Sequence, residues 1–443
     1  MPTTRRDAAR GIEVTTRPAW AEWERALSTH TPDPTRRQLG IPNDRPVVFS
    51  GHQPVVFHCG ILAKLIAQDE AARRTGAAKV WVVADQDDVD LSRVRVPVGR
   101  GSDLGAQLVE LLPPGSCPPG VAAASLPAAR IGPADDERLT ALIERLNAYA
   151  NERSLAAQFA HATIALASER LGIKPPKLLC ASELFGLHSE ALWQYTHKMS
   201  VEPHRCVGAY NKAAAAHPSG RVRLLEIDGE RVELPLWALQ KQSPRIPIDT
   251  ERHAIGDFYQ ERIAPRGLLM SLLVRAHLGE LFIHGTGGWA YDQITQAWAR
   301  DWLGIELAPM ALTTATMRLD LGFDTDELID PHRAAWEAHH ARHTPAMLGD
   351  EGTQHHKDRL VSEIHARKAR GEDPGVVFAE LQDLLDRFRG EHRKQIAELD
   401  SRLEQAKAME KQYELADDRT WAFVLFDDEQ LASLDTAVRA SLG

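Results

Sequence analysis

Residues 45 to 84 constrain the fold of this chain more than any other part of it. Arg45 to Ser50 (RPVVFS) and Lys79 to Ala84 (KVWVVA) are short, apolar and rich in β-branched residues, which is typical of buried strands. Gly60 to Arg74 lies between them and carries apolar residues at helical spacing, and Gly76 ends the pattern. A strand, a helix and a strand in this order form a βαβ unit, so we expect a parallel sheet.

Length, charge and cysteine content narrow the class of protein. The 443 residues suit two or three folding units, and 43% hydrophobic with 26% charged residues is normal for a soluble globular protein. The net charge of −10 argues against general nucleic-acid binding, which needs cations to neutralise phosphates. The four cysteines include no C-x-x-C pair, and no apolar run approaches the ~20 residues that cross a bilayer. We therefore expect a cytoplasmic protein with reduced thiols and no membrane partner.

Further elements extend the predicted core. Glu280 to Ile283 (ELFI) predicts a second strand that leads through a glycine-rich loop into a helix from Trp289 to Leu303, and Lys177 to Ala181 predicts another strand. Two insertions are expected, near 110–150 and 215–250. The first begins with a surface excursion over 111–134, and a helical pattern follows from 135 to 171. The second contains a hairpin at Asp228-Gly229.

The last quarter of the chain has helical composition. Apolar residues spaced by three and four predict a helical seam at near-heptad period: Phe378, Leu381, Leu385, Phe388, His392, Ile396, Leu399, Leu403, Ala406 and Tyr413. The breaker at 371–374 predicts two antiparallel arms. The predicted fold class is thus α/β. A parallel sheet core spans 1–330, and a C-terminal helical coiled-coil arm spans 331–443, with its last apolar segment docking back on the core.

Polar groups follow the first strand, where parallel α/β sheets bind ligands. Gly51 allows a close approach, and His52, Gln53 and His58 offer donors and acceptors. The helix that begins near Gly60 directs its N-terminal amides at the same place, which favours an anion. The alternative is an ordinary loop whose polar residues cap the helix.

Four carboxylates follow the second strand, in the run Asp85-Gln86-Asp87-Asp88-Val89-Asp90. Such a cluster repels itself unless a cation pairs with it. It is suited to hold Mg²⁺, to grip an amino group or to act as general acid and base. A solvated turn with one aspartate capping a helix is the alternative.

The loop His284-Gly285-Thr286-Gly287-Gly288 is the third candidate site. Glycines between a buried strand and a helix can cradle a phosphate with bare amides, although a tight turn explains them as well. His339 and His343 could share a metal, but no acidic or cysteine partner completes a set, so no metal site is predicted.

These motifs in this order resemble the bacillithiol biosynthesis enzymes of the BshC family, which add cysteine. The family's G-Q-Q-x-G-L-F-x-G-P-L-Y run is matched by Gly51 to Gly60, and its F-W-x-x-x-E-D-H-D run by Val80-Trp81 followed by Asp85 to Asp88. Its G-G-x-G-E-x-x-Y run is matched by Gly285 to Tyr291. This chain departs from the pattern at His52, Gln86, Asp87 and Gly288, the last of which replaces a glutamate, with Asp292 the nearest carboxylate.

The resemblance implies that the core is Rossmann-like, binds a nucleotide and contains an inserted connective region. It also implies a ligase that joins an amino acid to an amino-sugar acceptor on this core. It implies ATP or ADP, with Mg²⁺ a further candidate, and small-molecule partners; the arm would suit a homodimer. Two alternatives remain: a nucleotidyltransferase or sugar-modifying enzyme on the same core, and a non-catalytic module that binds through the coiled coil. The residues implied are, for catalysis, Asp85, Asp87, Asp88 and His52; for substrate, Gly51, Gln53, His58, Tyr291 and Asp292; and for nucleotide, Gly60, His284, Gly285, Thr286, Gly287 and Gly288.

Overall fold

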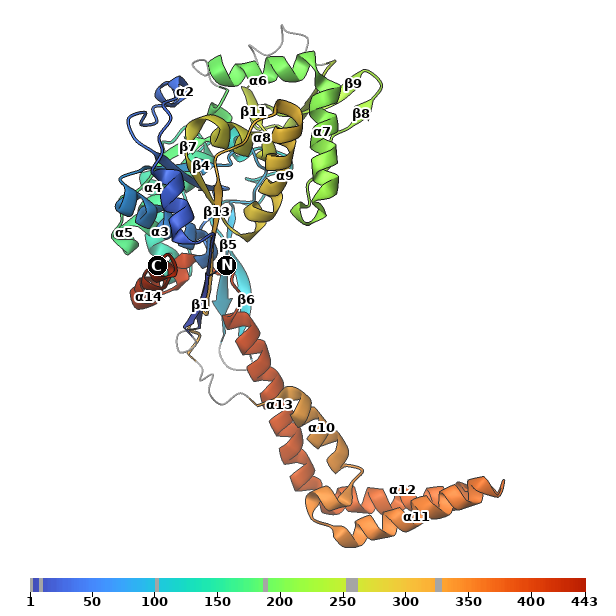
Figure 1. Ribbon diagram of the computed structural model, residues 1–443. Coiled ribbons are helices and arrows are strands. Elements are labelled where there is room, and N and C mark those ends of the chain that lie inside the picture. Colours follow the sequence, from blue (N-terminus) through green and yellow to red (C-terminus); the bar gives the residue numbers. More distant parts are fainter. Residues whose placement is uncertain (1–2, 8–10, 100–102, 186–189, 252–261, 323–328) are drawn as a thin grey trace. The chain divides into compact units, whose positions relative to one another are not determined.

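The computed structural model describes residues 3–7, 11–99, 103–185, 190–251, 262–322 and 329–443 (Figure 1). The chain divides into two compact units. Unit 1 comprises Met1–Val96, Gln107–Leu319 and Asp418–Gly443, and unit 2 comprises Pro97–Ala106 and Asp320–Asp417.

Unit 1 is built on a seven-stranded sheet of order β1-β2-β13-β12-β3-β4-β7. The strands are β1 (Thr3–Asp7), β2 (Ile12–Arg17), β13 (Met310–Met317), β12 (Leu281–His284), β3 (Val47–His52), β4 (Ala78–Val83) and β7 (Lys177–Cys180). The run from β13 to β7 is parallel, which confirms the α/β class. The sheet is mixed, however, because β2 pairs antiparallel with both β13 and β1. The N-terminal residues of β1 and β2 carry no long apolar run that would have predicted this edge.

Helices cover both faces of the sheet. Helices α3 (Cys59–Thr75), α5 (Leu155–Leu171) and α14 (Asp428–Ser441) pack on one face, and α7 (Pro203–Ala216), α8 (Gly267–Leu273) and α9 (Thr286–Leu303) on the other (Figure 1). On the α9 side, Phe49 and Phe282 of the sheet join Trp298 and Trp302 of α9 in one buried cluster. This apolar cluster fixes β12 and α9 relative to β3, and so positions the loops at the strand ends.

The predicted insertions are ordered parts of unit 1. The hairpin at Asp228-Gly229 is confirmed, since β8 (Ile227–Asp228) pairs antiparallel with β9 (Arg231–Leu239), and Gly229 adopts φ +57°. β9 also pairs with β10 (Ile246–Asp249) and β11 (Arg262–Pro265). The prediction of a surface excursion over 111–134 is wrong in part, because Val121 to Ala124 are buried and pack against this second sheet.

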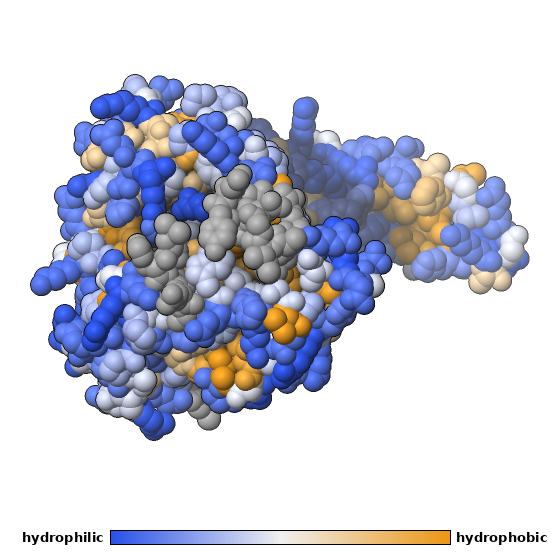
Figure 2. Space-filling model, turned by 90° about the horizontal axis from the view of Figure 1, so that it is seen from above, coloured by the Kyte–Doolittle hydropathy of each residue, from blue (hydrophilic) through white to orange (hydrophobic). Residues whose placement is uncertain are grey.

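Short elements complete unit 1. The predicted helix over 135–171 is interrupted, and its first part is α4 (Thr140–Ala148). The others are α1 (Trp20–Leu27), α2 (Pro34–Gln38) and α6 (Glu190–Val201). β5 (Arg93–Val98) pairs with β6 (Gly105–Glu110), and residues 97–98 and 105–106 of this pair belong to unit 2. The face seen in Figure 2 is largely hydrophilic, with hydrophobic residues in small patches. No helix in the described ranges has the length and apolarity needed to cross a membrane.

Unit 2 contains α10 (Pro331–Ala341), α11 (Glu351–Ala369), α12 (Gly375–Glu391) and α13 (Arg393–Ala416). α11 packs on α12 and α10 packs on α13, and the α11–α12 turn falls at the predicted breaker. The predicted seam is interrupted, because α12 ends and α13 begins around His392. It is also misplaced by one residue at its start, since Phe378 is 52% exposed and Val377 is buried instead. A supercoil of these helices stays a prediction.

Candidate active site

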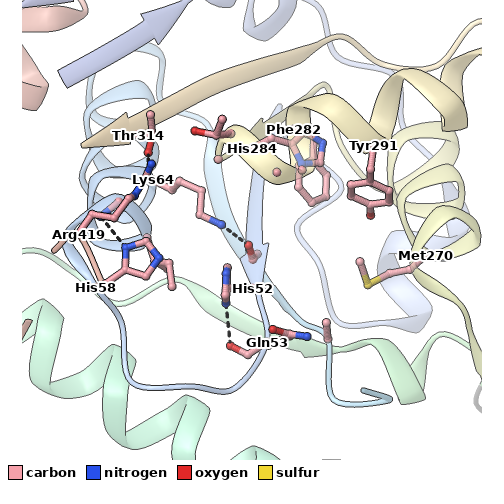
Figure 3. Close-up of a pocket in the computed structure, with 18 residues that line it drawn as sticks. His52, Gln53, His58, Lys64, Met270, Phe282, His284, Tyr291, Thr314 and Arg419 are labelled. Carbon is pink, nitrogen blue, oxygen red and sulfur yellow. Dashed lines mark hydrogen bonds between the residues drawn. The ribbon is translucent and has the colours of Figure 1, made fainter. Parts of the chain in front are cut away.

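A cavity of about 400 Å³ lies at the carboxyl ends of β3 and β12, between the loops that lead into α3 and α9 (Figure 3). Its position is the one at which open α/β sheets bind ligands. Its size falls within the range of small-molecule sites. The residues that line it are Gly51, His52, Gln53, His58, Gly60, Ile61, Lys64, Ala84, Met270, Phe282, His284, Gly285, Thr286, Gly287, Gly288, Tyr291, Thr314 and Arg419. The first and third predicted motifs therefore meet in one place.

The loop after β3 is shaped by the start of α3. His58 is the N-cap, and its Nδ1 accepts the amide of Gly60 at 3.0 Å, so Nδ1 carries no proton in this arrangement. The amides of Ile61 and Leu62 donate to the His58 carbonyl. The amide of Gly60, expected to cradle a phosphate, is thus already engaged. Gly51 has a structural reason to be glycine, because a Cβ there would lie 2.5 Å from the Val82 carbonyl oxygen.

The segment after β12 was expected to be a glycine-rich loop over 284–288, but the structure shows a shorter connection. Residues 286 to 288 are the first turn of α9 rather than a loop before the helix. Gly285 is the N-cap, and no side chain caps this helix end. At the start of α3, the His58 side chain accepts a backbone amide. At the start of α9, no side chain does so, and the first amides of α9 lie at the cavity without a capping acceptor. Such a bare N-terminus carries a partial positive charge and suits an anion.

Lys64 is the main functional candidate that the sequence analysis missed. It lies on α3, is only 3% exposed, and donates a hydrogen bond of 2.5 Å from Nζ to the Gly51 carbonyl oxygen. Its Nζ also lies 5.3 Å from the centre of the Trp81 ring. Burial lowers the pKa of Lys64 to about 7. The sequence signal was available, since Lys64 interrupts the otherwise apolar stretch from Ile61 to Ala67.

Arg419 and Thr314 reach the cavity from distant parts of the chain. The Arg419 Nη2 donates to Thr314 Oγ1 at 2.9 Å, and Thr314 belongs to β13. The segment around Arg419 is held in place by a bridge between His58 and Ala422 and by the Phe423 amide, which donates to the Phe57 carbonyl. A Cβ on Gly60 would lie 2.9 Å from Arg419 Nη2, so glycine makes room for this guanidinium at the start of α3.

The two histidines of the first motif are neutral at neutral pH. Burial and the charge of Lys64 lower the pKa of His52 to about 3. Burial, Arg419 and Lys64 lower the pKa of His58 to about 4. Cys59, which follows His58, is buried with its pKa raised to about 12, so it is no thiolate nucleophile. The permanent charge on the described lining is therefore positive.

Asp85 of the acidic run does not reach the cavity. It is 1% exposed and accepts hydrogen bonds from the backbone amide and hydroxyl of Ser182, at 2.9 and 2.5 Å. Burial raises its pKa, against the opposing hydrogen bonds from Ser182. Asp85 thus ties the end of β4 to the segment after β7.

Asp87 and Asp88 share a cationic partner, Arg245. Arg245 pairs with Asp87 at 3.2 Å and also with Asp88, which accepts the Gly120 amide at 3.0 Å as well. Asp87 has one link to the cavity, because the Gln53 Nε2 donates to it at 3.0 Å. The repulsion noted in the sequence is thus relieved by a cation of the chain itself.

His284 and Asp292 form a buried pair at the start of α9. The His284 Nε2 lies 2.8 Å from Asp292 Oδ2, which also accepts from Arg275 at 2.9 Å. Asp292 is fully buried behind the cavity wall rather than on it, so it orients His284 instead of touching a ligand. Tyr291 does line the cavity, and its hydroxyl bonds with Ser271 at 2.9 Å.

The donor set fits one of the two expected cofactors. A nucleotide phosphate would find Lys64, Arg419 and the α9 amides, all of which favour negative charge. Mg²⁺ prefers carboxylate ligands, and the described lining contains none. No group of three or more His, Cys, Asp or Glu in the described ranges is arranged to hold a metal. The residues thus fit a nucleotide and do not fit a protein-bound Mg²⁺.

Comparisons with known proteins leave the family open. No family model matches the chain, and no curated protein matches it. A solved structure described as a "putative arginyl t-RNA synthetase" from Campylobacter jejuni is similar over 96% of this chain and 97% of that one, with 10% identity and a TM-score of 0.28.

Proposed function

We propose that unit 1 binds an anionic small substrate, a phosphate ester or nucleotide, in this cavity, and that the protein is an amino-acid ligase of the bacillithiol-biosynthesis type. The observation that carries the binding step is Lys64, a buried amine directed at the cavity with no carboxylate beside it among the described lining residues. A buried ammonium costs several kcal/mol without a counter-ion. A ligand anion supplies that counter-ion.

The surroundings of Lys64 support the same substrate class. The uncapped start of α9 adds bare amides on one side, and Arg419 adds a guanidinium on the other. A cation at the N-terminus of α3 is unfavourable on its own, because it faces the positive end of the helix dipole. An anion between Arg419 and the helix removes this repulsion.

Amide formation suits such a site. An amine nitrogen attacks the carbonyl carbon of an activated amino acid, the bond to the phosphate oxygen breaks, and the phosphate leaves with an additional negative charge. Lys64 and the α9 amides would stabilise that charge as it develops. Gln53 and His52, on the β3 side, would orient the acceptor. The resemblance to the cysteine-adding family supports cysteine and an amino sugar as the pair to test.

Ligand-induced stabilisation followed by product analysis tests this function. ATP, ADP and pyrophosphate should raise the melting temperature of the full chain, and glucose at equal concentration should not. Incubation with ATP, cysteine and an amino-sugar acceptor should then give an amide detectable by mass spectrometry. Stabilisation without any product would favour a binding module or a nucleotidyltransferase, and absence of stabilisation by every anion would overturn the binding step itself.

A further inference from the structure

His284 is held rigidly at the wall of the cavity. Its ring stacks on Phe282 with centres 4.3 Å apart and planes 17° apart. Its Nε2 lies 2.8 Å from Asp292 Oδ2. Arg275 fixes Asp292 in turn, and donates to Gln296 Oε1 at 2.7 Å and to the Ala308 carbonyl at 2.8 Å. The imidazole therefore has one orientation.

The hydrogen bond to Asp292 also selects the tautomer. An ionised carboxylate only accepts, so His284 Nε2 carries the proton and Nδ1 of the neutral ring has a free lone pair. Burial raises the pKa of Asp292, but the guanidinium of Arg275 and the hydrogen bonds that Asp292 accepts, including the one from His284, outweigh it and lower that pKa, so the carboxylate is ionised. No hydrogen bond engages Nδ1 within the described ranges.

Nδ1 points at the first turn of α9. A Cβ on Gly288 would lie 2.7 Å from Nδ1, closer than side chains tolerate, so glycine is what lets the ring occupy this position. The amides of that turn are the ones expected to hold the anion. An acyl carbon bonded to a phosphate held there, and the acceptor amine that attacks that carbon, would therefore lie close to Nδ1.

Burial keeps His284 neutral against the charge of Asp292. Lys64 on α3 and Arg275 before β12 are cations, and Asp292 on α9 is the anion. The rings of Tyr291 and His284 form a T-shaped pair with centres 6.4 Å apart. Burial lowers the pKa of His284, Arg275 and Lys64 add to this, and Asp292 opposes it. A neutral imidazole at neutral pH can accept a proton.

We infer that His284 is the general base of this pocket, and that Asp292 and Arg275 are positioning residues that hold its tautomer. The inference rests on the proposed function. As the acceptor amine forms its bond to the acyl carbon, its N–H proton passes to His284 Nδ1, and the transient imidazolium is stabilised by Asp292. The proton then leaves to the departing phosphate or to water.

Carbethoxylation of the wild-type chain tests the inference without an assay of catalytic activity. Diethyl pyrocarbonate reacts with an unprotonated imidazole nitrogen, so His284 should be modified at pH 7, as located by peptide mass spectrometry. Pyrophosphate should protect His284 but not His161 on α5, whose side chain is 42% exposed and lies outside the cavity lining. If pyrophosphate raises the melting temperature but His284 is unmodified, or is modified equally with and without pyrophosphate, the inference fails while the proposed function stands. If no anion stabilises the chain, both fail.

Two variants add a catalytic readout. His284→Gln keeps a donor for Asp292 but removes the base, so kcat for amide formation should fall about 10²–10⁴-fold while pyrophosphate still stabilises the chain. His161→Gln should leave kcat unchanged. Asp292→Asn offers an amide donor to Nε2 and shifts the proton to Nδ1, so carbethoxylation of His284 should be lost. Because that variant leaves Arg275 buried without its anion and can unfold, the wild-type protection experiment remains decisive. Full activity of His284→Gln would overturn the inference.

Discussion

The ammonium group of Lys64 on α3 donates a hydrogen bond to the carbonyl oxygen of Gly51 on β3, inside a cavity whose described lining carries no carboxylate. The carbonyl satisfies one of the three N–H donors, but it does not neutralise the charge. Folding therefore places a cation in a low-dielectric site and leaves its counter-ion to come from outside. The first two predictions test the free-energy cost of burying the Lys64 charge. The last measurement tests whether that charge binds an anion.

Replacing Lys64 by methionine should stabilise the empty protein. The variant keeps an unbranched apolar side chain and removes a buried charge, so at pH 6 we expect the free energy of unfolding to rise by roughly 3 kcal/mol. Lys79→Met is the matched control, because Lys79 is paired with Asp69 at 2.6 Å and its loss should destabilise. Urea denaturation at pH 6 measures both. A stability loss in Lys64→Met would show that the lysine is a structural partner.

Lys64 should also make stability depend on pH in a defined direction. Its pKa is lowered from 10.5 to about 7, so between these values the unfolded chain binds a proton that the folded chain does not. The free energy of unfolding should then rise with pH from 7 to 10.5, by at most about 1.4 kcal/mol per unit. The comparison is wild type minus Lys64→Met, which removes other titrations. An equal slope in both proteins would contradict the assignment.

Arg419 should contribute to anion binding although it is exposed. A charged hydrogen bond to the ligand is worth about 1.5 kcal/mol at such a site, so Arg419→Gln should weaken ADP binding by about tenfold. Arg25→Gln on α1 changes net charge equally but lies outside the cavity lining. Titration calorimetry at constant salt compares the two. Equal weakening in both variants would mean that only net charge matters.

Gly288 should be intolerant of a side chain, whereas its neighbour should tolerate one. Gly288→Ala places a Cβ 2.7 Å from His284 Nδ1, so we expect a loss of about 1–3 kcal/mol from overpacking and a displaced imidazole. Gly287→Ala meets no atom within 4 Å and should be neutral or slightly stabilising through helix propensity. Thermal denaturation distinguishes them. Identical melting temperatures would show that His284 is free to move.

Asp88 should prove structural rather than catalytic. Asp88→Asn weakens the pairing with Arg245 and should cost about 1 kcal/mol of stability, without changing the affinity for ADP. On the same sample, calorimetry measures the affinity for ADP and denaturation measures the free energy of unfolding, so together they distinguish a structural role of Asp88 from a catalytic one. A large loss of affinity for ADP with an unchanged free energy of unfolding would show that Asp88 takes part in ligand binding.

The pattern of apolar and polar residues along the sequence predicted those parts of the site that lie directly after a predicted strand. The strand–helix–strand at 45–84 fixed β3, α3 and β4, and the rule that ligands bind at strand ends placed His52 and Gly285 at one cavity. Arg419 and Thr314 could not be found in this way, because they come from sequence positions more than 100 apart and meet only in three dimensions.

The sequence analysis placed the acidic run Asp85 to Asp90 at the site, whereas the lining of the cavity does not include these carboxylates, for a related reason. Composition shows that Asp85, Asp87 and Asp88 need partners, but it does not show that Ser182 and Arg245 provide them. The antiparallel edge of the sheet was missed because β2 pairs with β13, almost 300 residues away in sequence. Pairings of this kind depend on packing that no local window contains.

The affinity for sulfate as a function of pH tests the central claim most directly. Sulfate keeps a constant charge between pH 6 and 9, so any change in affinity reports on the protein. Lys64 should deprotonate above pH 7, and we predict affinity that is constant below pH 7 and falls by up to about tenfold per unit above it. Lys64→Met should bind weakly with no pH dependence. Wild-type affinity that is flat up to pH 9, or equal to that of Lys64→Met, would contradict a Lys64-centred anion site.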